Sequence, residues 1–138
     1  MKTYLSFQIL PNNARRNENP FMKVKRIVTN FNTPDVALAK IFYQDILGLE
    51  QLMDHGWITT YGSSETSMNI QISFASEGGS GTTTPDLSIE VDDVDEAFKK
   101  MQEAGFPIIY GLTNEPWGVR RFYTRDPFGK LINILSHL

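Results

Sequence analysis

Two stretches of the chain carry apolar residues at helical spacing, and both are punctuated in the same way. The first covers residues 35–45, with Thr33 as its predicted N-cap, Pro34 at the first helical position and Gly48 just after its end. Its spacing predicts that one face is buried against a sheet. The residues of that face are Leu38, Ile41, Phe42 and Ile46.

The second helical stretch covers residues 93–103 and lies 58 residues further along the chain. Asp93 followed by Glu96 predicts a capped N-terminus, and Gly105 ends the helix. Its apolar face repeats at intervals of three and four residues. That face consists of Val94, Ala97, Phe98, Met101 and Ala104.

Each helix is preceded by one strand-like run and followed by three. These runs cover residues 25–32, 49–54, 57–61 and 68–75 in the first half and 86–91, 107–111, 119–125 and 130–136 in the second. The pattern predicts an α+β fold made of two βαβββ repeats, with curved mixed sheets, helices outside and a cleft on the concave face. We expect one domain over residues 22–138, with modules at about 23–76 and 85–137.

Two segments fall outside these modules. Residues 1–21 contain one short apolar run and a polar stretch, so we expect an N-terminal extension that is either mobile or laid against a partner subunit. Residues 77–85 are rich in glycine and threonine and join the halves. We expect them to form a flexible linker.

Alternation along the strands separates side chains that pack under the helices from those that face the cleft. In the second half, Leu87, Ile89 and Val91 face the helix. The predicted cleft-facing set is Val28, Asn30, Asn32, Asn69, Gln71, Ser73, Asp86, Ser88, Glu90, Leu131, Asn133 and Leu135.

Charge and composition exclude several classes of function. Thirteen Lys and Arg against sixteen Asp and Glu give a net charge of −3, and no basic run exceeds two residues, so we expect no nucleic-acid partner. Without cysteine there is no disulfide or thiolate site. No apolar stretch is long enough to span a membrane, and no secretory signal precedes the domain, so we expect a cytoplasmic protein.

Four motifs on this doubled framework resemble the vicinal oxygen chelate superfamily, the group of glyoxalases, bleomycin resistance proteins and extradiol dioxygenases. The resemblance covers residues 23–136. The motifs are Phe42-Tyr43-Gln44-Asp45-Ile46-Leu47-Gly48-Leu49, Ser88-Ile89-Glu90-Val91-Asp92-Asp93-Val94, Pro116-Trp117-Gly118 and Arg125-Asp126-Pro127-Phe128-Gly129. The resemblance implies a ligand cleft and a homodimer.

Many members of this superfamily hold a divalent metal with His, Gln or Glu on the first strand of each half and a carboxylate on the last strand. The matching positions here are Val28, Asp86 and Asn133, with Gln71 near the end of the first half. Only Asp86 is anionic, and one carboxylate with two amides is a poor set for a divalent ion, so we expect no catalytic metal or other cofactor. A metal on Asp86, Gln71 and Asn133 stays open as an alternative.

We expect the small-molecule ligand to contact eight residues. They are Asn30, His55, Trp57, Gln71, Asp86, Trp117, Arg121 and Asn133. Trp57 and Trp117 flank turns, where an indole can stack on a planar ligand.

Several of these assignments have structural alternatives. His55 can be a hairpin residue, Asp86 a turn residue and Asn133 a strand-to-strand hydrogen-bonding residue. Arg120 and Arg121 are adjacent, so alternation turns only one of them inward. We interpret His137 as a surface residue.

The leading hypothesis is a small-molecule binding protein of the bleomycin-resistance type that works without a catalytic metal. The alternative is a metal-dependent lyase, isomerase or dioxygenase of the glyoxalase type with an unusual ligand set. A third hypothesis is a non-catalytic partner module, and whether any reaction is catalysed is left open.

Overall fold

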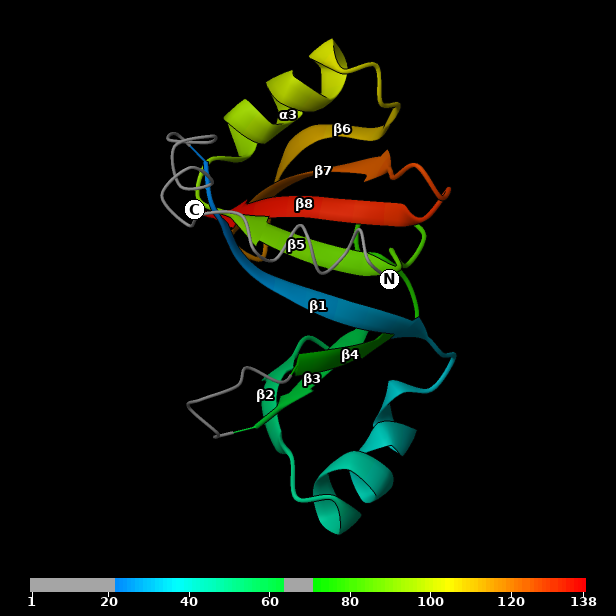
Figure 1. Ribbon diagram of the computed structural model, residues 1–138. Helices are drawn as coiled ribbons and strands as arrows, with labels where there is room; N and C mark the ends of the chain where they lie inside the picture. Colours follow the sequence, from blue (N-terminus) through cyan, green and yellow to red (C-terminus); the bar gives the residue numbers. More distant parts are fainter. Residues whose placement is uncertain (1–21, 64–70) are drawn as a thin grey trace, which may run out of the picture.

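The computed structural model describes residues 22–63 and 71–138, and within them eight strands and three helical segments follow one another (Figure 1). Their order is β1 (Val24–Asn32), η1 (Val36–Leu38), η2 (Lys40–Ile46), β2 (Glu50–Asp54), β3 (Ile58–Gly62), β4 (Gln71–Ala75), β5 (Leu87–Val91), α3 (Val94–Glu103), β6 (Ile108–Glu115), β7 (Val119–Arg125) and β8 (Leu131–His137). The α+β class and the doubled βαβββ order are confirmed. The predicted extension and the start of the fourth predicted strand lie outside the described residues.

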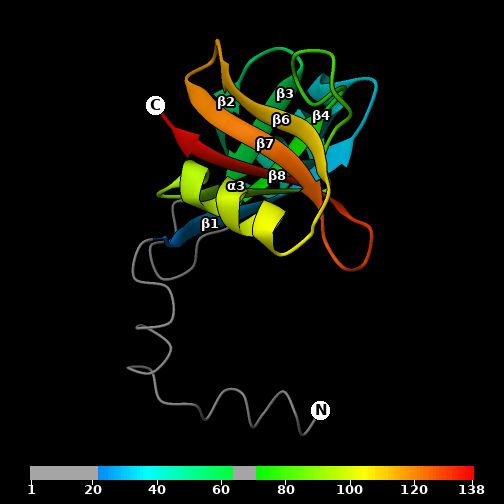
Figure 2. The same cartoon turned by 90° about the horizontal axis from the view of Figure 1, so that it is seen from above.

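The two modules share one continuous sheet. Its strand order is β2-β3-β4-β1-β5-β8-β7-β6. The first strands of the modules, β1 and β5, pair antiparallel in the middle, and each pairs in parallel with the last strand of its own module. The sheet is curved, with α3 and the η1–η2 segment at opposite ends of the molecule (Figures 1 and 2).

The second module contains the main apolar core. Phe122 is fully buried and packs edge-on against Phe98 of α3, with ring centroids 5.1 Å apart. The helix begins as the sequence predicts, because Asp93 Oδ1 accepts a hydrogen bond from Glu96 N at 3.0 Å. The buried cluster consists of Val91, Val94, Ala97, Phe122, Ile132 and Ile134.

The first helical segment differs from its prediction. The expected buried stripe is wrong, since Leu38, Ile41, Phe42 and Ile46 are 55–69% exposed. The segment consists of a 3₁₀ turn followed by a π-helix, whose hydrogen bonds reach back five residues, as from Leu47 N to the carbonyl oxygen of Phe42 at 3.2 Å. Spacings of three and four residues therefore no longer define the face on the sheet.

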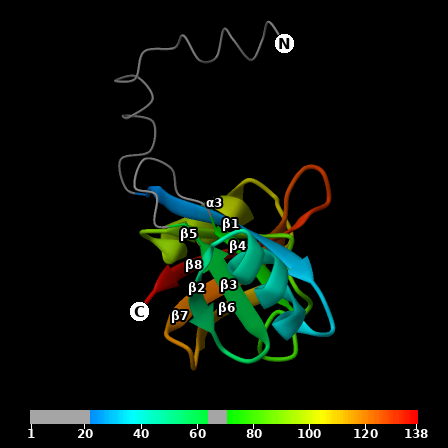
Figure 3. The same ribbon diagram turned by 90° about the horizontal axis from the view of Figure 1, so that it is seen from below.

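Instead, Tyr43 lies against the sheet of the first module. Its ring is 4.8 Å from that of Phe74 on β4 and 6.5 Å from that of the buried Tyr61 on β3. Figure 3 shows the η1–η2 segment, in cyan, over the strands of the first module. The apolar side chains that the sequence assigns to the core form an exposed patch on the described chain.

None of the helices within residues 22–63 and 71–138 is long and apolar enough to cross a membrane.

Candidate functional site

The concave face of the sheet encloses a cavity of about 330 Å³. This volume lies within the usual range for small-molecule pockets. Side chains from both modules line it, because the sheet curves until its two halves face each other. Apolar groups such as Val28, Ile58 and Leu135 alternate there with amides, hydroxyls and a few charged groups.

Seven of the eight residues predicted to contact a ligand line this cavity. They are Asn30, His55, Trp57, Gln71, Trp117, Arg121 and Asn133. The eighth, Asp86, is not among the lining residues: it is exposed, and its Oδ2 accepts a hydrogen bond from Leu131 N at 2.9 Å. Asp86 thus bonds to the first residue of β8 from its place just before β5. Ligand contact by the other seven stays a prediction.

The floor of the cavity holds a neutral hydrogen-bonded triad. Asn30 Nδ2 and Asn133 Nδ2 donate to Ser88 Oγ at 3.0 and 3.1 Å, because Ser88 pairs with Asn133 across β5 and β8. Asn133 therefore makes the strand-to-strand contact that was its structural alternative. Its Oδ1 is buried and has no hydrogen-bond partner within the described chain.

The positions that the resemblance assigns to metal ligands do not fit a divalent ion. Val28 has no donor atom, Gln71 Oε1 accepts a hydrogen bond from Arg26 Nη1 at 2.6 Å, and Asp86 is occupied by the backbone of Leu131. Across residues 22–63 and 71–138, no three His, Cys, Asp or Glu side chains lie close enough together to hold a metal ion. A neutral floor offers little to offset the dehydration of such an ion.

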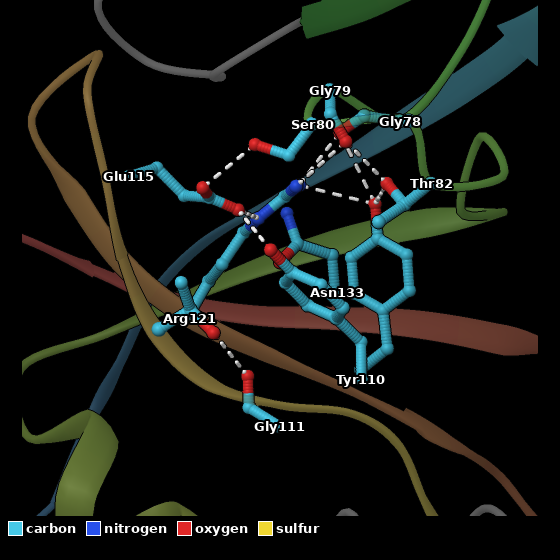
Figure 4. A network of polar contacts seen from close by, with 12 residues as sticks. Gly78, Gly79, Ser80, Thr82, Tyr110, Gly111, Glu115, Arg121 and Asn133 are labelled. Atoms are coloured by element: carbon cyan, nitrogen blue, oxygen red, sulfur yellow. Dashed lines mark hydrogen bonds and ion pairs between the residues drawn. The ribbon is translucent and has the colours of Figure 1, made fainter.

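A buried arginine forms one wall of the cavity (Figure 4). The side chain of Arg121 is 3% exposed, and its Nε donates to Glu115 Oε2 at 2.7 Å. Nη1 donates to the carbonyl oxygen of Gly78 at 2.7 Å, and Nη2 to that of Gly79 at 3.2 Å. The ambiguity between the two adjacent arginines is thus resolved, because Arg120 points outward to Asp95 on α3, at 2.9 Å.

Aromatic rings enclose the guanidinium as well. Its Cζ lies 4.9 Å from the ring centroid of Trp117, 5.0 Å from that of Tyr123 and 5.3 Å from that of Tyr110. With both a carboxylate and backbone carbonyls as partners, Arg121 is a structural anchor. It is not a free cation waiting for an anionic ligand.

This anchor also immobilises the connection between the modules. Besides the two carbonyl contacts, Ser80 Oγ donates to Glu115 Oε1 at 2.8 Å and Tyr123 OH donates to the Gly78 carbonyl oxygen at 3.2 Å. Gly78 and Gly79 are both buried. The expectation of a flexible linker is wrong here, because side chains of β7 bind the carbonyl oxygens of Gly78 and Gly79. A glycine-rich sequence indicates where the backbone can turn, but not which side chains bind its carbonyl oxygens.

The environment of Arg121 shifts two pKa values. Burial raises the pKa of Glu115, but hydrogen bonds from Ser80, Arg121 and Tyr110 outweigh it, so the net pKa lies below its ordinary value. Burial also raises the pKa of the Tyr123 phenol, which keeps that hydroxyl protonated as a donor. The ion pair is therefore charged at neutral pH.

Two indoles close the cavity next to this loop. Trp57, just before β3, and Trp117, in the turn between β6 and β7, meet edge to face with ring centroids 5.3 Å apart. Gly79 packs against both: a Cβ there would lie 2.6 Å from Trp117 Cη2 and 2.9 Å from Trp57 Cη2. Its φ of +86° independently favours glycine.

His55 extends this aromatic end. It lies in the turn between β2 and β3, and its ring stacks on Trp57 with 6.4 Å between centroids. Asp54 Oδ1 accepts a hydrogen bond from Gly56 N at 2.9 Å, which caps the turn. His55 is therefore a hairpin residue that also lines the cavity, so its structural interpretation does not exclude the predicted ligand contact.

A charged cluster that the sequence did not predict lies where β1 begins and β8 ends. Arg26 and His137 line the cavity, and both contact the buried Glu90, whose carboxylate is 2.6 Å from Arg26 Nε and 2.8 Å from His137 Nδ1. His137 is a surface residue, as predicted, with a side chain that is 54% exposed. It is not frayed, however, because it is the last residue of β8 and contacts Glu90. The alternation that turns Asn133 and Leu135 inward also reaches His137, and was the available signal.

A sequence profile described as the Glyoxalase/Bleomycin resistance protein/Dioxygenase superfamily matches residues 24–134. No curated protein matches the whole sequence significantly.

Several solved structures are similar. A superfamily member from Vibrio splendidus 12B01 is 18% identical, covering 83% of this chain and 99% of that one, with a TM-score of 0.54. Methylmalonyl-CoA epimerase from Mycobacterium tuberculosis is 16% identical, covering 83% of this chain and 87% of that one, with a TM-score of 0.56. NAD-dependent benzaldehyde dehydrogenase from Legionella pneumophila is 16% identical, covering 82% of this chain and 100% of that one, with a TM-score of 0.64. At these identities the likeness shows the fold alone.

Glu115→Gln is expected to destabilise the protein by about 3–5 kcal/mol, because it leaves the buried guanidinium without a counter-charge. Urea denaturation measures this free energy of unfolding. Glu103→Gln, an exposed change on α3, is the matched control and should stay within about 0.5 kcal/mol of wild type. A loss below about 1 kcal/mol for Glu115→Gln would contradict the structural role of the ion pair.

Acid should weaken the fold. Burial raises the pKa of Glu90 too, but hydrogen bonds from His137 and Arg26 bring it below the ordinary 4.5, as for Glu115. Between the lowered pKa values of the folded protein and the ordinary values of the unfolded chain, the unfolded chain binds more protons than the folded protein. The free energy of unfolding is therefore highest above about pH 5 and falls as the pH drops through the lowered pKa values of Glu90 and Glu115. Denaturation at pH 7, 5, 4 and 3 tests this, and Glu90→Gln should flatten the slope. Stability that rises on acidification would refute it.

Proposed function

We propose that this chain, which belongs to the glyoxalase/bleomycin resistance protein/dioxygenase superfamily, binds a small organic molecule in its central cavity without a catalytic metal. The observation that carries the proposal is the chemistry of the cavity. Its floor is a neutral triad centred on Ser88, where a metal enzyme would need charged or imidazole ligands. One of its ends is a pair of indoles.

The aromatic end supports a ligand with a flat or apolar part. Trp57 and Trp117 present large apolar surfaces whose orientation is fixed by Gly79 and by the ring of His55. A preformed aromatic wall loses little conformational entropy when it binds, which favours stacking on a planar group. The neutral amides and hydroxyls of the floor supply directional hydrogen bonds.

We also propose that two copies of the chain pair through the exposed patch of the η1–η2 segment, defined by Leu38, Ile41, Phe42 and Ile46. Contiguous apolar side chains of this size on a surface are typical of interfaces. The homodimer that the family resemblance implies would cover them.

A thermal-shift screen tests the binding function. Aromatic metabolites and drugs are expected to raise the melting temperature of the protein, whereas Ni²⁺, Zn²⁺, Mn²⁺ and Fe²⁺ are not. Trp57→Ala should weaken binding of each hit about tenfold or more, because the stacking surface is lost. Phe128→Ala, an aromatic truncation at a residue outside the cavity that is 84% exposed, is the control. Stabilisation by metal alone, with stoichiometric metal in protein purified without chelator, would overturn the proposal.

The pairing has its own test. Light scattering after size exclusion should give twice the chain mass of 15.7 kDa, and Phe42→Glu should give a monomer, because a buried glutamate in an apolar interface is costly. Phe128→Glu, at an exposed site outside the patch, should leave the dimer intact. A monomeric wild type, or a Phe42→Glu dimer of unchanged affinity, would rule out this interface.

A further inference from the structure

A polar cluster occupies the part of the cavity where β1 and β4 begin and β8 ends. Arg26 on β1, Gln71 on β4 and His137 on β8 line the cavity, and Glu90 on β5 lies buried between the first and the last of them. Four strands therefore bring these side chains to one place. The register explains the meeting, since Arg26 pairs directly with Glu90 across β1 and β5.

Glu90 orients its neighbours without using all of their donors. Its Oε1 accepts from Arg26 Nε at 2.6 Å, and its Oε2 faces His137 Nδ1 at 2.8 Å. Because a carboxylate can only accept, Nδ1 is the protonated ring nitrogen in this contact. Arg26 Nη1 then donates to Gln71 Oε1 at 2.6 Å.

Two donor groups are left for the cavity. Within residues 22–63 and 71–138, Arg26 Nη2 and Gln71 Nε2 have no hydrogen-bond partner, whereas His137 Nε2 is an acceptor when Nδ1 donates to Glu90. An arginine whose Nε and Nη1 are already held is a preorganised donor, so little side-chain entropy is lost when an anion binds.

The balance of charge favours an anion at this end. Lys25 and Arg26 outnumber Glu90, whose nearest cations lie 3.7 and 2.6 Å from its carboxylate. The other arginine of the cavity wall, Arg121, is neutralised by Glu115. Arg26 is itself paired with Glu90, so the excess positive charge at this end comes from having two cations, Lys25 and Arg26, beside one carboxylate. The other carboxylate that lines the cavity, Glu77, follows the opposite end of β4 from Gln71.

The spacing between Gln71 and Trp57 limits the size of the ligand. Gln71 begins β4 and Ala75 ends it, and Ala75 pairs with Ile58, the residue after Trp57. Four residues of strand span about 13 Å. A molecule with an aromatic ring system and a short acidic arm has this length.

We propose that Arg26 and Gln71, with His137 beside them, bind the carboxylate of a small aromatic or apolar acid whose ring lies against Trp57 and Trp117. This assignment rests on the proposed binding function and names the ligand class for it. Glu90 acts as a positioning residue, since it holds Arg26 and His137 and does not itself face the anion.

Matched pairs of acids and amides test the assignment. Calorimetric titrations would compare 1-naphthaleneacetate with 1-naphthaleneacetamide and indole-3-propionate with indole-3-propionamide, which differ in charge far more than in shape. The acid is expected to bind about tenfold or more tightly than its amide, as a charge-assisted pair predicts. Arg26→Gln should remove this preference, so that each acid and its amide bind with affinities within about twofold of each other.

Controls separate charge at the site from charge in general. Arg125→Gln removes an exposed arginine that does not line the cavity, so its acid preference should equal that of wild type. Arg26→Lys, which keeps the charge but loses the planar fork, should retain part of the preference and covers the case in which Arg26→Gln does not fold.

The outcomes distinguish the two proposals. If wild type binds amides as tightly as acids, or if Arg125→Gln loses the preference too, the carboxylate assignment is overturned while the binding function stands. If neither member of any pair binds, and no aromatic compound shifts the melt, the binding function fails and the assignment falls with it.

Discussion

The ion pair between Arg121 and Glu115 is the interaction on which the closed cavity depends. Both side chains are 3% exposed, so each would destabilise the fold by several kcal/mol if it stood alone. Their mutual contact, together with hydrogen bonds from the guanidinium to the carbonyls of Gly78 and Gly79, offsets that penalty. Because those carbonyls belong to the connection between the modules, one buried charge ties the two halves of the fold together.

This constraint reaches the aromatic wall through Gly79. With the loop anchored, its backbone lies close enough to Trp57 and Trp117 that no side chain fits between them. The indoles therefore meet in a defined geometry, and the cavity has a rigid apolar end. A loop that the sequence describes only as glycine-rich acts as a wall because an arginine of β7 binds it.

Neutral and charged side chains occupy different parts of the cavity. Around Ser88 the floor is uncharged, whereas Arg26, Glu90 and His137 gather where β1 begins and β8 ends. Members of one fold can place different chemistry on the same strands. In this chain the central strands carry amides and hydroxyls, and the charged groups lie towards an edge of the cavity, which suits an amphipathic ligand better than a metal ion.

The first helical segment shows the limit of periodicity as a guide. Strand alternation is a property of the extended backbone, which is why most strand bounds and inward residues such as Asn30 and Asn133 were predictable. The exception is β6, which continues to Glu115, four residues beyond its predicted end at 111. Helical spacing assumes 3.6 residues per turn. Once the backbone at Phe42 and Leu47 adopted a wider turn, the predicted face was lost and Tyr43 took its place.

By itself, the sequence determined the doubled βαβββ order, the second helix with its Asp93 cap, the family, and seven of the eight residues assigned to the ligand cavity, because these follow from local periodicity and from motifs contiguous in the chain. Only the tertiary structure decided that Arg121 is an anchor, that Asp86 bonds to a neighbouring strand, and that His137 meets Glu90. Those roles depend on which partners lie within about 3 Å, and that distance is set by sheet register and curvature between residues far apart in the chain.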